Sequence, residues 1–466
     1  MRFSSGPALV VSILIISAPI AAGKGGGYFP EYRIAETGSG VTLYTAECGE
    51  VPLVTLQVII NAGSVFDPPG MEGLSSLTAG MIMKRAGGLD EDRIYRRIES
   101  VGGEVSVRPG RDIVIIEGSF ISGDLETGMD LISRVLIFPE FPAEDLEKEK
   151  SRTLSDIGSR RYYDFVTDIF TEAVLPAGYA HPVSGYRETV EGITIEDVRE
   201  FHRRRYTPEG TALVITGRFE RAEAVEMAGK YFGGWEAEGP GEEKASAGRG
   251  EKAFEAGVLI IDQPGVTQSE IRIGGPAPGR NTGDYYALTL GSKILGQGRT
   301  SRLYRKLREE KGLVYGIRTA AGYFRDAGYF GVFTYTGNDQ VREVIDGVLS
   351  VMDRFGREGA GQSELAGAGR YFKGALPFMM ETGGDIADRI SDIHIFGLDR
   401  DCFATFADSI DALSSERVRE SVTRHFISGK RVIVVLTDYS ATREQFDGLA
   451  PLRVIGRREA EGGISN

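Results

Sequence analysis

The sequence predicts an α+β protein built from two similar halves. Three observations support this prediction: apolar strand segments cluster along the chain, helical segments are set apart between them, and a unit of one helix and one strand occurs twice. Clustered strands with segregated helices favour mostly antiparallel sheets covered by helices over a doubly wound parallel sheet. The length of 466 residues suits about two to three domains.

The first 22 residues have the pattern of a cleavable secretory signal. Arg2 supplies a positive charge, residues 8–16 are apolar, and small residues lead up to Ala22. The apolar run is short for a membrane span, with an uncleaved anchor as the alternative. We therefore predict an exported chain, with the bacterial periplasm as the expected compartment. No later run approaches about 18 apolar residues, so we expect no stable membrane insertion of the mature chain.

Two apolar segments near the start of the mature chain predict buried strands. Residues 54–60 and 112–117 are rich in β-branched side chains. Between them, apolar residues at helical spacing predict one helix over residues 73–85 and a second helix that ends at Gly102.

A polar segment divides the chain. Residues 236–252 read EAEGPGEEKASAGRGEK, which is rich in glycine and has no apolar period, so we predict a linker. It separates an N-terminal domain at residues 23–235 from a C-terminal domain at residues 253–456. Residues 457–466 are predicted to form a polar tail.

The two parts repeat one another near their ends. Residues 195–206 (IEDVREFHRRRY) and 415–426 (SERVRESVTRHF) both predict a helix, and a strand follows each at the same spacing, at 211–215 and 431–435. The apolar positions correspond without a gap: Val198 with Val418, Tyr206 with Phe426, and Ile215 with Val435. A match that extends over a helix, a loop and a strand indicates duplicated domains.

Composition and charge exclude some classes of partner. The chain is 41% hydrophobic and 26% charged, which is an ordinary globular balance, and its net charge is −13. This acidic balance argues against nucleic acid and anionic lipid, because both require a basic surface. The two cysteines, Cys48 and Cys402, lie in different halves; two free thiols are the favoured interpretation, and one disulfide remains open.

Two longer motifs point to a family. Residues 296–315 read GQGRTSRLYRKLREEKGLVY, and residues 62–81 read AGSVFDPPGMEGLSSLTAGM. Together they resemble the two signatures of the insulinase/pitrilysin (M16) metallopeptidases. The resemblance extends over almost the whole mature chain. It implies two tandem homologous M16-type domains, each a mostly antiparallel β-sheet packed with helices.

The resemblance also shows that the family's zinc site is degenerate in this chain. The family reads GLAHFLEHM where this chain reads GLSSLTAGM, so Ser76 and Gly80 replace the two zinc-binding His and Ala79 replaces the general-base Glu. The family's third ligand, a Glu, corresponds to Asp156. One carboxylate does not hold zinc, so we predict a solvated Asp156, no metal, no cofactor and no catalytic residue in this chain.

The histidines offer no replacement site. No two of them lie four residues apart and none neighbours a cysteine, so we predict no separate zinc site. The four histidines are His181, His202, His394 and His425. A surface or packing role is expected for His202 and His425, which lie within the repeated helices.

The second motif keeps the residues that bind substrate. The resemblance implies that Arg308 and Tyr315 bind a peptide at its scissile bond. An arginine fork and a tyrosine hydroxyl aimed at a peptide carbonyl would favour the oxyanion of hydrolysis. Gly312 is expected to end the helix that carries Arg308, and a strand is expected to start at Leu313, so both side chains should converge at the junction.

Two function classes follow. In the first, the chain is a non-catalytic, substrate-binding subunit of an exported heterodimeric M16 zinc metallopeptidase. Its partner would carry zinc on an intact His-x-x-Glu-His helix and cleave peptides. In the second, the chain is a scaffold or peptide-binding protein of this fold without a peptidase partner; the retained Arg308 and Tyr315 count against it. A self-sufficient peptidase is disfavoured because the ligands and the base are missing.

Overall fold

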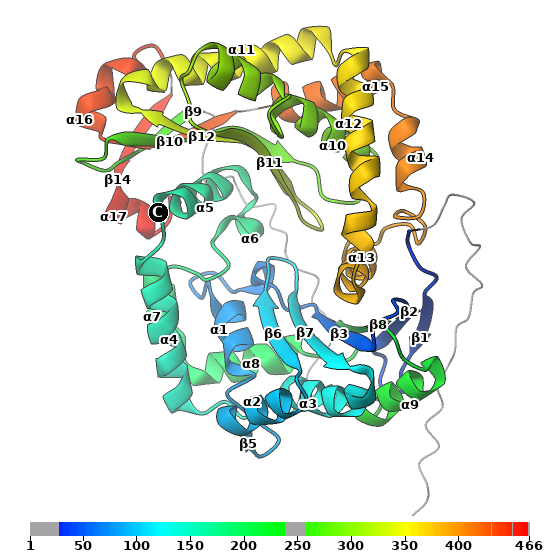
Figure 1. The fold of residues 1–466 in the computed structure, drawn as a ribbon. Coiled ribbons are helices and arrows are strands. Elements are labelled where there is room, and N and C mark those ends of the chain that lie inside the picture. The colour runs from blue at the N-terminus through cyan, green and yellow to red at the C-terminus, as the bar shows by residue number, and fades with distance from the viewer. Residues whose placement is uncertain (1–27, 238–256, 430, 450, 465–466) are drawn as a thin grey trace, which may run out of the picture.

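The chain forms two six-stranded sheets, each packed with helices, which confirms the α+β prediction (Figure 1). The computed structural model describes residues 28–237, 257–429, 431–449 and 451–464. The predicted signal segment at residues 1–22 lies outside these ranges, as does most of the predicted linker at residues 236–252.

The first sheet has the strand order β1-β2-β8-β3-β7-β6. Among these neighbours β2 and β8 run parallel and the other pairs are antiparallel. Every residue of β3 after Leu53 is buried, as the β-branched run predicted. The strand predicted at residue 112 starts at Val114, because Gly110 and Ile113 first close a turn through a 2.8 Å hydrogen bond. The strands are β1 (Arg33–Glu36), β2 (Thr42–Glu47), β3 (Leu53–Ile60), β6 (Glu104–Pro109), β7 (Val114–Ile121) and β8 (Thr211–Gly217).

The second sheet has the order β11-β12-β10-β13-β9-β14. Here β9 runs parallel to β13 and to β14, and the remaining neighbours are antiparallel. The strands are β9 (Gly257–Asp262), β10 (Gln268–Ala277), β11 (Ile317–Tyr323), β12 (Gly328–Gly337), β13 (Val432–Thr437) and β14 (Leu452–Gly456).

The helices of the first half include the segment predicted at residues 73–85, but that helix is shorter than predicted. It ends at Met81, and Arg85 already belongs to a small hairpin of β4 (Arg85–Ala86) and β5 (Leu89–Asp90), turned by Gly87 and Gly88 at positive φ. The helices are η1 (Ser64–Phe66), α1 (Leu74–Met81), α2 (Glu91–Ser100), η2 (Ser122–Asp124), α3 (Leu125–Ile137), α4 (Ala143–Gly158), α5 (Tyr162–Val174), α6 (Ala177–Ala180), α7 (Arg187–Gly192), α8 (Ile195–Arg205) and α9 (Arg221–Phe232).

The second half has its own set, in which η3 and η6 are π-helical. The elements are α10 (Tyr285–Gly296), η3 (Tyr304–Glu310), η4 (Asn338–Gln340), α11 (Val341–Glu358), α12 (Gln362–Ala375), η5 (Pro377–Met380), α13 (Gly383–Phe396), α14 (Phe406–Asp411), α15 (Ser415–Val422), η6 (Thr423–Ile427), α16 (Tyr439–Thr442), η7 (Arg443–Phe446) and α17 (Arg457–Glu461).

The repeated unit occupies equivalent places in the two halves. Helix α8 leads into β8, and helix α15 with η6 leads into β13. Strand β8 lies between β2 and β3, and β13 lies between the corresponding strands β9 and β10. The sheets differ at one edge. Strand β1 precedes its neighbour in sequence and is antiparallel to it, whereas β14 follows its neighbour and is parallel to it.

Each half covers the second face of the other half's sheet. Helix α5 of the first half packs on β10 and β13, and helix α13 of the second half packs on β3 and β8 (Figure 1). Phe170 of α5 contacts Phe333 and Tyr329 edge-on, at ring-centroid distances of 5.7 and 6.1 Å. In return, Gln57 of β3 donates to Asp388 of α13 at 2.9 Å. Because of this exchange, each hydrophobic core contains residues of both halves.

The predicted polar tail is part of this arrangement. Residues from Arg457 onward form α17 and dock against α5 (Figure 1). The Arg457 guanidinium lies over the rings of Tyr162 and Phe165, and the backbone N–H of Ile464 donates to Glu172 at 2.7 Å. Ile464 is almost fully buried.

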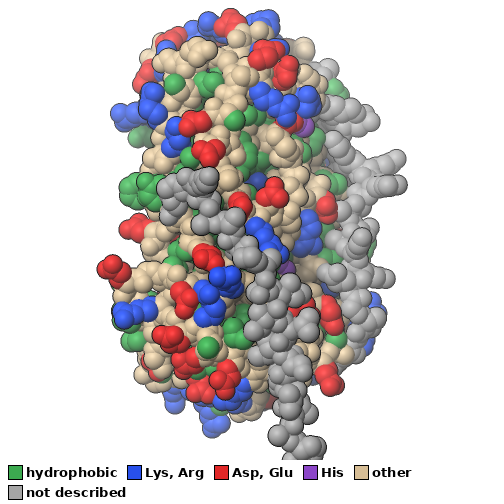
Figure 2. Space-filling model, turned by 90° about the vertical axis from the view of Figure 1, so that its right-hand side faces the viewer, with side chains coloured by type: hydrophobic (Ala, Val, Ile, Leu, Met, Phe, Trp, Pro, Cys, Tyr) green, Lys and Arg blue, Asp and Glu red, His purple; other side chains and the backbone are tan. Residues whose placement is uncertain are grey.

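Three further observations concern the cysteines, the apolar character of the helices and the surface charge. Cys48 and Cys402 are both free thiols. Within the described residues, no helix has the length and apolar character to cross a membrane. On the face drawn in Figure 2, basic and acidic side chains are interspersed and form no continuous basic surface.

We expect Phe170→Ala to lower the free energy of unfolding by about 3–5 kcal/mol, because a fully buried aromatic ring between the halves would leave a cavity. Urea unfolding measures this change through Trp235, the only tryptophan, which reports on the first half, and through circular dichroism of the whole chain. Both signals should shift together.

The matched control is Phe378→Ala, which removes a ring that is 73% exposed and should change stability by no more than about 0.5 kcal/mol. A shift of the Trp235 signal alone, with the circular dichroism midpoint unchanged, would contradict the interlocked arrangement.

We also expect stability to fall as pH decreases from 6.5 to 4. Burial, and then the Arg325 guanidinium, lower the pKa of His394 from 6.5 to about 4, and its ring is hydrogen-bonded to Tyr44 of the first half at 3.1 Å. The unfolded chain therefore takes up a proton in this window that the folded chain does not. Urea midpoints of wild type and His394→Gln across this range should converge at low pH. His202 also has a pKa lowered to about 4, but it is present in both proteins and does not change the difference between them. Two midpoint curves that stay parallel across this pH range would contradict the assignment to His394.

Candidate functional site

Helix α1, which carries three of the four degenerate zinc-site positions, starts at a fixed corner. Gly73 precedes it at φ 101°, and a Cβ there would lie 2.8 Å from the Ser184 carbonyl oxygen, so this position requires glycine. The Asp67 carboxylate accepts hydrogen bonds from the backbone N–H groups of Gly73 and Ser75 at 2.8 and 2.7 Å. These bonds satisfy free donors at the start of the helix.

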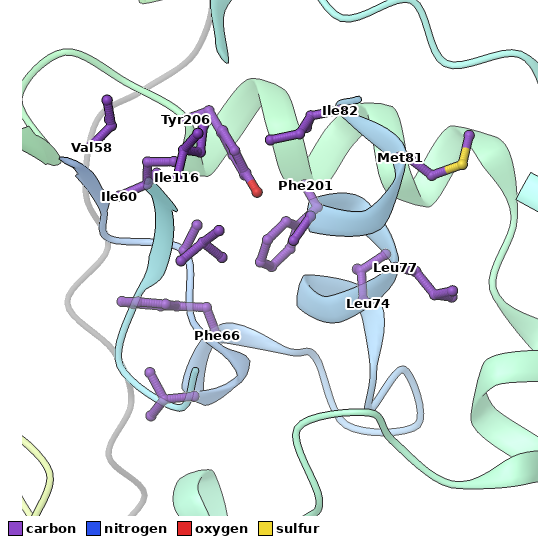
Figure 3. Close-up of a cluster of buried hydrophobic side chains, with 14 of the residues drawn as sticks. Val58, Ile60, Phe66, Leu74, Leu77, Met81, Ile82, Ile116, Phe201 and Tyr206 are labelled. Carbon is purple, nitrogen blue, oxygen red and sulfur yellow. The ribbon is translucent and has the colours of Figure 1, made fainter. Parts of the chain in front are cut away.

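The apolar side of α1 faces the core of the first half. Leu74, Leu77 and Met81 belong to one buried cluster with Phe201 of helix α8 and with Tyr206, which follows that helix (Figure 3). Ala79 belongs to the same buried cluster, whereas Ser76 and Gly80 are only partly buried. The position of the helix is therefore set by this packing together with the hydrogen bonds at its start.

The place of the second zinc ligand is filled by a different group. A Cβ on Gly80 would overlap the Glu149 carboxylate of helix α4, whose Cδ would lie only 2.8 Å from it. Glu149 is 3% exposed and is paired with Arg152, and the Lys84 ammonium lies 3.8 Å from its Oε2. Two cations from the chain itself thus balance the buried charge.

These residues do not fit zinc. Ser76, Ala79 and Gly80 offer no imidazole or carboxylate, and the nearby Glu149 is already bound to basic side chains. Across the described part of the chain, no group of three or more His, Cys, Asp or Glu is arranged to hold a metal ion.

Asp156 lies on α4 and is exposed, as predicted for a solvated helix residue. The carboxylate that faces α1 belongs to Glu149, two helical turns earlier on the same helix. Sequence reasoning missed Glu149. Its signal was a single acidic residue on the inward face of α4, next to the buried Leu146, Lys150 and Thr153.

Arg308 and Tyr315 converge, as predicted. The Arg308 guanidinium donates to the Tyr315 carbonyl oxygen and lies 4.7 Å from the centre of the Tyr315 ring and 5.2 Å from that of Tyr304. The helix that carries Arg308 ends at Glu310, and Gly312 at φ 66° turns the chain back. Leu307 anchors this helix in the core and Tyr315 is 72% exposed, so the pair is presented outward from a rigid support.

The strand predicted to start at Leu313 starts at Ile317 instead, which corrects that expectation. Before Ile317, threonine hydroxyl groups of β12 donate to backbone carbonyl groups that would accept inter-strand hydrogen bonds in a strand. Thr336 donates to the Leu313 carbonyl at 2.7 Å and Thr334 donates to that of Gly316 at 2.8 Å. Tyr315 is therefore held in a turn, where its ring leans toward Tyr335 at 6.4 Å.

Arg318, which sequence reasoning did not single out, lies beside this pair on β11. It is exposed, its guanidinium bonds the Tyr163 hydroxyl, and it lies over the rings of Tyr163 and Phe333. Its signal in the sequence was a third cation close to Tyr315, at the start of an edge strand.

Each of the four histidines is hydrogen-bonded within the chain, which agrees with the packing role expected for His202 and His425. His181 bonds the carbonyl of Ser64 at 3.1 Å, His202 bonds that of Leu136 at 3.0 Å, and His425 pairs with Asp284 at 2.8 Å. His394 joins the two halves through Tyr44, as described above.

Two family models match the chain. The model of the insulinase family (peptidase family M16) matches residues 46–184, and the model of the peptidase M16 inactive domain matches residues 192–370. The chain belongs to peptidase family M16. The first match contains α1 and α4, and the second contains η3 and β11.

Relatives and solved structures of family M16 extend over most of the chain. An uncharacterised zinc protease of Mycobacterium tuberculosis is 24% identical over 87% of this chain and 92% of its own length, and one of Bacillus subtilis is 22% identical over 74% and 83%. The crystal structure of a peptidase M16 inactive domain from Pseudomonas fluorescens matches with a TM-score of 0.81 and 23% identity over 87% of this chain and 97% of that one. A protease from Helicobacter pylori matches with a TM-score of 0.80 and 16% identity over 88% and 100%.

We expect the substitution Gly80→Ala to change sign with its background. In the wild type it should destabilise, because the new methyl group would push the Glu149 carboxylate away from Arg152. In a Glu149→Ala background it should stabilise by about 0.5–1 kcal/mol, the usual gain from replacing glycine by alanine in a helix. Urea unfolding of the four proteins in this cycle measures the coupling. Additive effects would show that Gly80 and Glu149 do not compete for the same space.

Proposed function

We propose that this chain is the non-catalytic, substrate-binding subunit of an exported heterodimeric M16 zinc metallopeptidase, and that it supplies Arg308 and Tyr315 to its partner's active site. The partner is a catalytic M16 subunit with an intact His-x-x-Glu-His helix, and it holds the zinc. The substrates are peptides.

One contrast within the chain carries this proposal. The zinc position is closed by Glu149 and its two cations, while the Arg308–Tyr315 pair is assembled, with Arg308 half-buried and Tyr315 exposed. A protein that only needed the fold would have no chemical use for a guanidinium and an exposed phenol held together in a turn. The contrast is the one expected of a subunit that binds substrate for another subunit's chemistry.

The geometry suits stabilisation of an oxyanion. One Arg308 nitrogen donates to the Tyr315 carbonyl, which holds the planar fork against the turn, and the Tyr315 side chain is exposed. Both groups are donors, and the arginine stays charged at every working pH. Donors held in place before the reaction favour the developing negative charge of a tetrahedral intermediate.

Export and the periplasmic location rest on the signal pattern of residues 1–22. The net charge of −13 agrees with the absence of a nucleic-acid partner.

We expect Arg308→Ala to lower the turnover of the reconstituted pair by about 10²-fold or more, as loss of one oxyanion donor typically does. Tyr315→Phe should act in the same direction by removing one hydroxyl. Arg308→Lys should rescue poorly, because an ammonium does not reproduce the planar fork. The measurement is steady-state peptide cleavage by this chain together with the catalytic subunit.

The control is Arg305→Ala, which removes an exposed arginine from the same helix and should leave turnover unchanged. Thermal melting and size-exclusion chromatography check folding and assembly. Unchanged turnover for both Arg308→Ala and Tyr315→Phe in an intact complex would favour a scaffold or peptide-binding protein without peptidase function.

A further inference from the structure

Arg318 is held as a pre-aligned cation next to Tyr315. It lies on β11, at the edge of the second sheet, with its guanidinium 5.7 Å from the Tyr163 ring centre and 5.2 Å from that of Phe333. A hydrogen bond to the Tyr163 hydroxyl fixes it further. The nitrogen that bonds Tyr163 is the only one of the Arg318 guanidinium with a hydrogen-bond partner in the described part of the chain, so the other N–H groups can bind a ligand.

A second arginine shares the same two rings. Arg272 lies directly across Phe333 in the strand register, at 4.5 Å from the Tyr163 ring centre and 4.8 Å from that of Phe333, and it is fully buried. Its guanidinium is balanced by Glu270 at 2.9 Å. Arg272 and Arg318, both positively charged, therefore lie over the same two aromatic rings, and the Glu270 carboxylate pairs with the buried Arg272.

The exposed Arg318 has no carboxylate partner of this kind in the described part of the chain. Within the described residues neither Arg318 nor Arg308 has a carboxylate within 4.0 Å, although many arginines of this acidic chain form ion pairs. A carboxylate brought by a ligand would satisfy Arg318 and reduce its repulsion with Arg272. The planar fork of arginine matches a carboxylate with two parallel hydrogen bonds.

We propose that Arg318 is a specificity-determining residue that binds an acidic side chain of the peptide held by Arg308 and Tyr315, so that the substrates are acidic peptides. This inference rests on the proposed function, because it takes Arg308 and Tyr315 as the place where the peptide lies. Arg318 follows Tyr315 by three residues at the start of β11, so it recognises a side chain close to the bond that those two residues hold.

Direct binding to the full mature chain tests the inference without a partner. The probes are fluorescently labelled decapeptides of Ala, Gly and Ser, acetylated and amidated at their ends, with either two central Glu or two central Gln. A third probe carries Gln and a free C-terminal carboxylate. Fluorescence anisotropy should show the Glu peptide binding about tenfold more tightly than the blocked Gln peptide, the size of one charge-assisted hydrogen bond.

Variants locate the effect. Arg318→Gln should abolish the preference for Glu, and Arg318→Lys should retain part of it because the charge remains and the fork is lost. The matched control Arg305→Gln makes the same change in net charge on the helix before it and should keep the preference. The difference should shrink at high salt if charge carries it.

Equal binding of the Glu and blocked Gln peptides by wild type would overturn the inference, and so would a preference that survives in Arg318→Gln. If the free-carboxylate peptide binds best and loses that advantage in Arg318→Gln, the terminal group and not a side chain is the ligand, which overturns the assignment to acidic side chains.

Cleavage by the reconstituted pair separates this inference from the proposed function. If Arg308→Ala lowers turnover but Arg318→Gln lowers kcat/KM equally for both blocked peptides, the specificity role is wrong and the proposed function stands. If the binding preference depends on Arg318 while Arg308→Ala and Tyr315→Phe leave turnover unchanged, the proposed function fails and Arg318 remains an acidic-peptide site.

Discussion

The exchange of helices between the two sheets is the interaction on which the rest of the structure depends. Without α5, one face of β10 and β13 would be open to water, and without α13 the same would hold for β3 and β8. Burial of apolar surface is the main driving force of folding, so neither half is complete by itself. The exchange also positions the residues around Tyr315. Helix α5 supplies Tyr163, whose ring lies under Arg318, and α5 covers the sheet to which β11, the strand that follows Tyr315, belongs.

The space beside Gly80 is occupied by the Glu149 carboxylate. A buried carboxylate is costly unless it is paired and hydrogen-bonded, and here Arg152 and Lys84 meet that requirement. Helix α1 lies between α4 and α8, next to this group of charges. In the second half, Arg308 and Tyr315 depend only on the turn between η3 and β11.

Local patterns predicted local structure well. The β-branched run of β3, the repeated helix and strand, and the convergence of Arg308 with Tyr315 all depend on neighbours in sequence, so the sequence was sufficient to predict them. Periodicity shows that a face is buried but not what covers it, which is why the exchange of α5 and α13 was not predicted. Glu149 was missed because its position against Gly80 depends on how two helices cross. The start of β11 was misplaced because threonines of another strand take the carbonyl groups before it.

The helix exchange also sets an order of events during synthesis. Strands β3 and β8 are made well before α13, which is encoded far into the second half of the chain. Until α13 has been made, the sheet face that it covers is open and apolar side chains on that face, such as Ile59 and Val214, are exposed; exposed apolar surface promotes aggregation. The first sheet therefore reaches the arrangement described here only after α13 has been made.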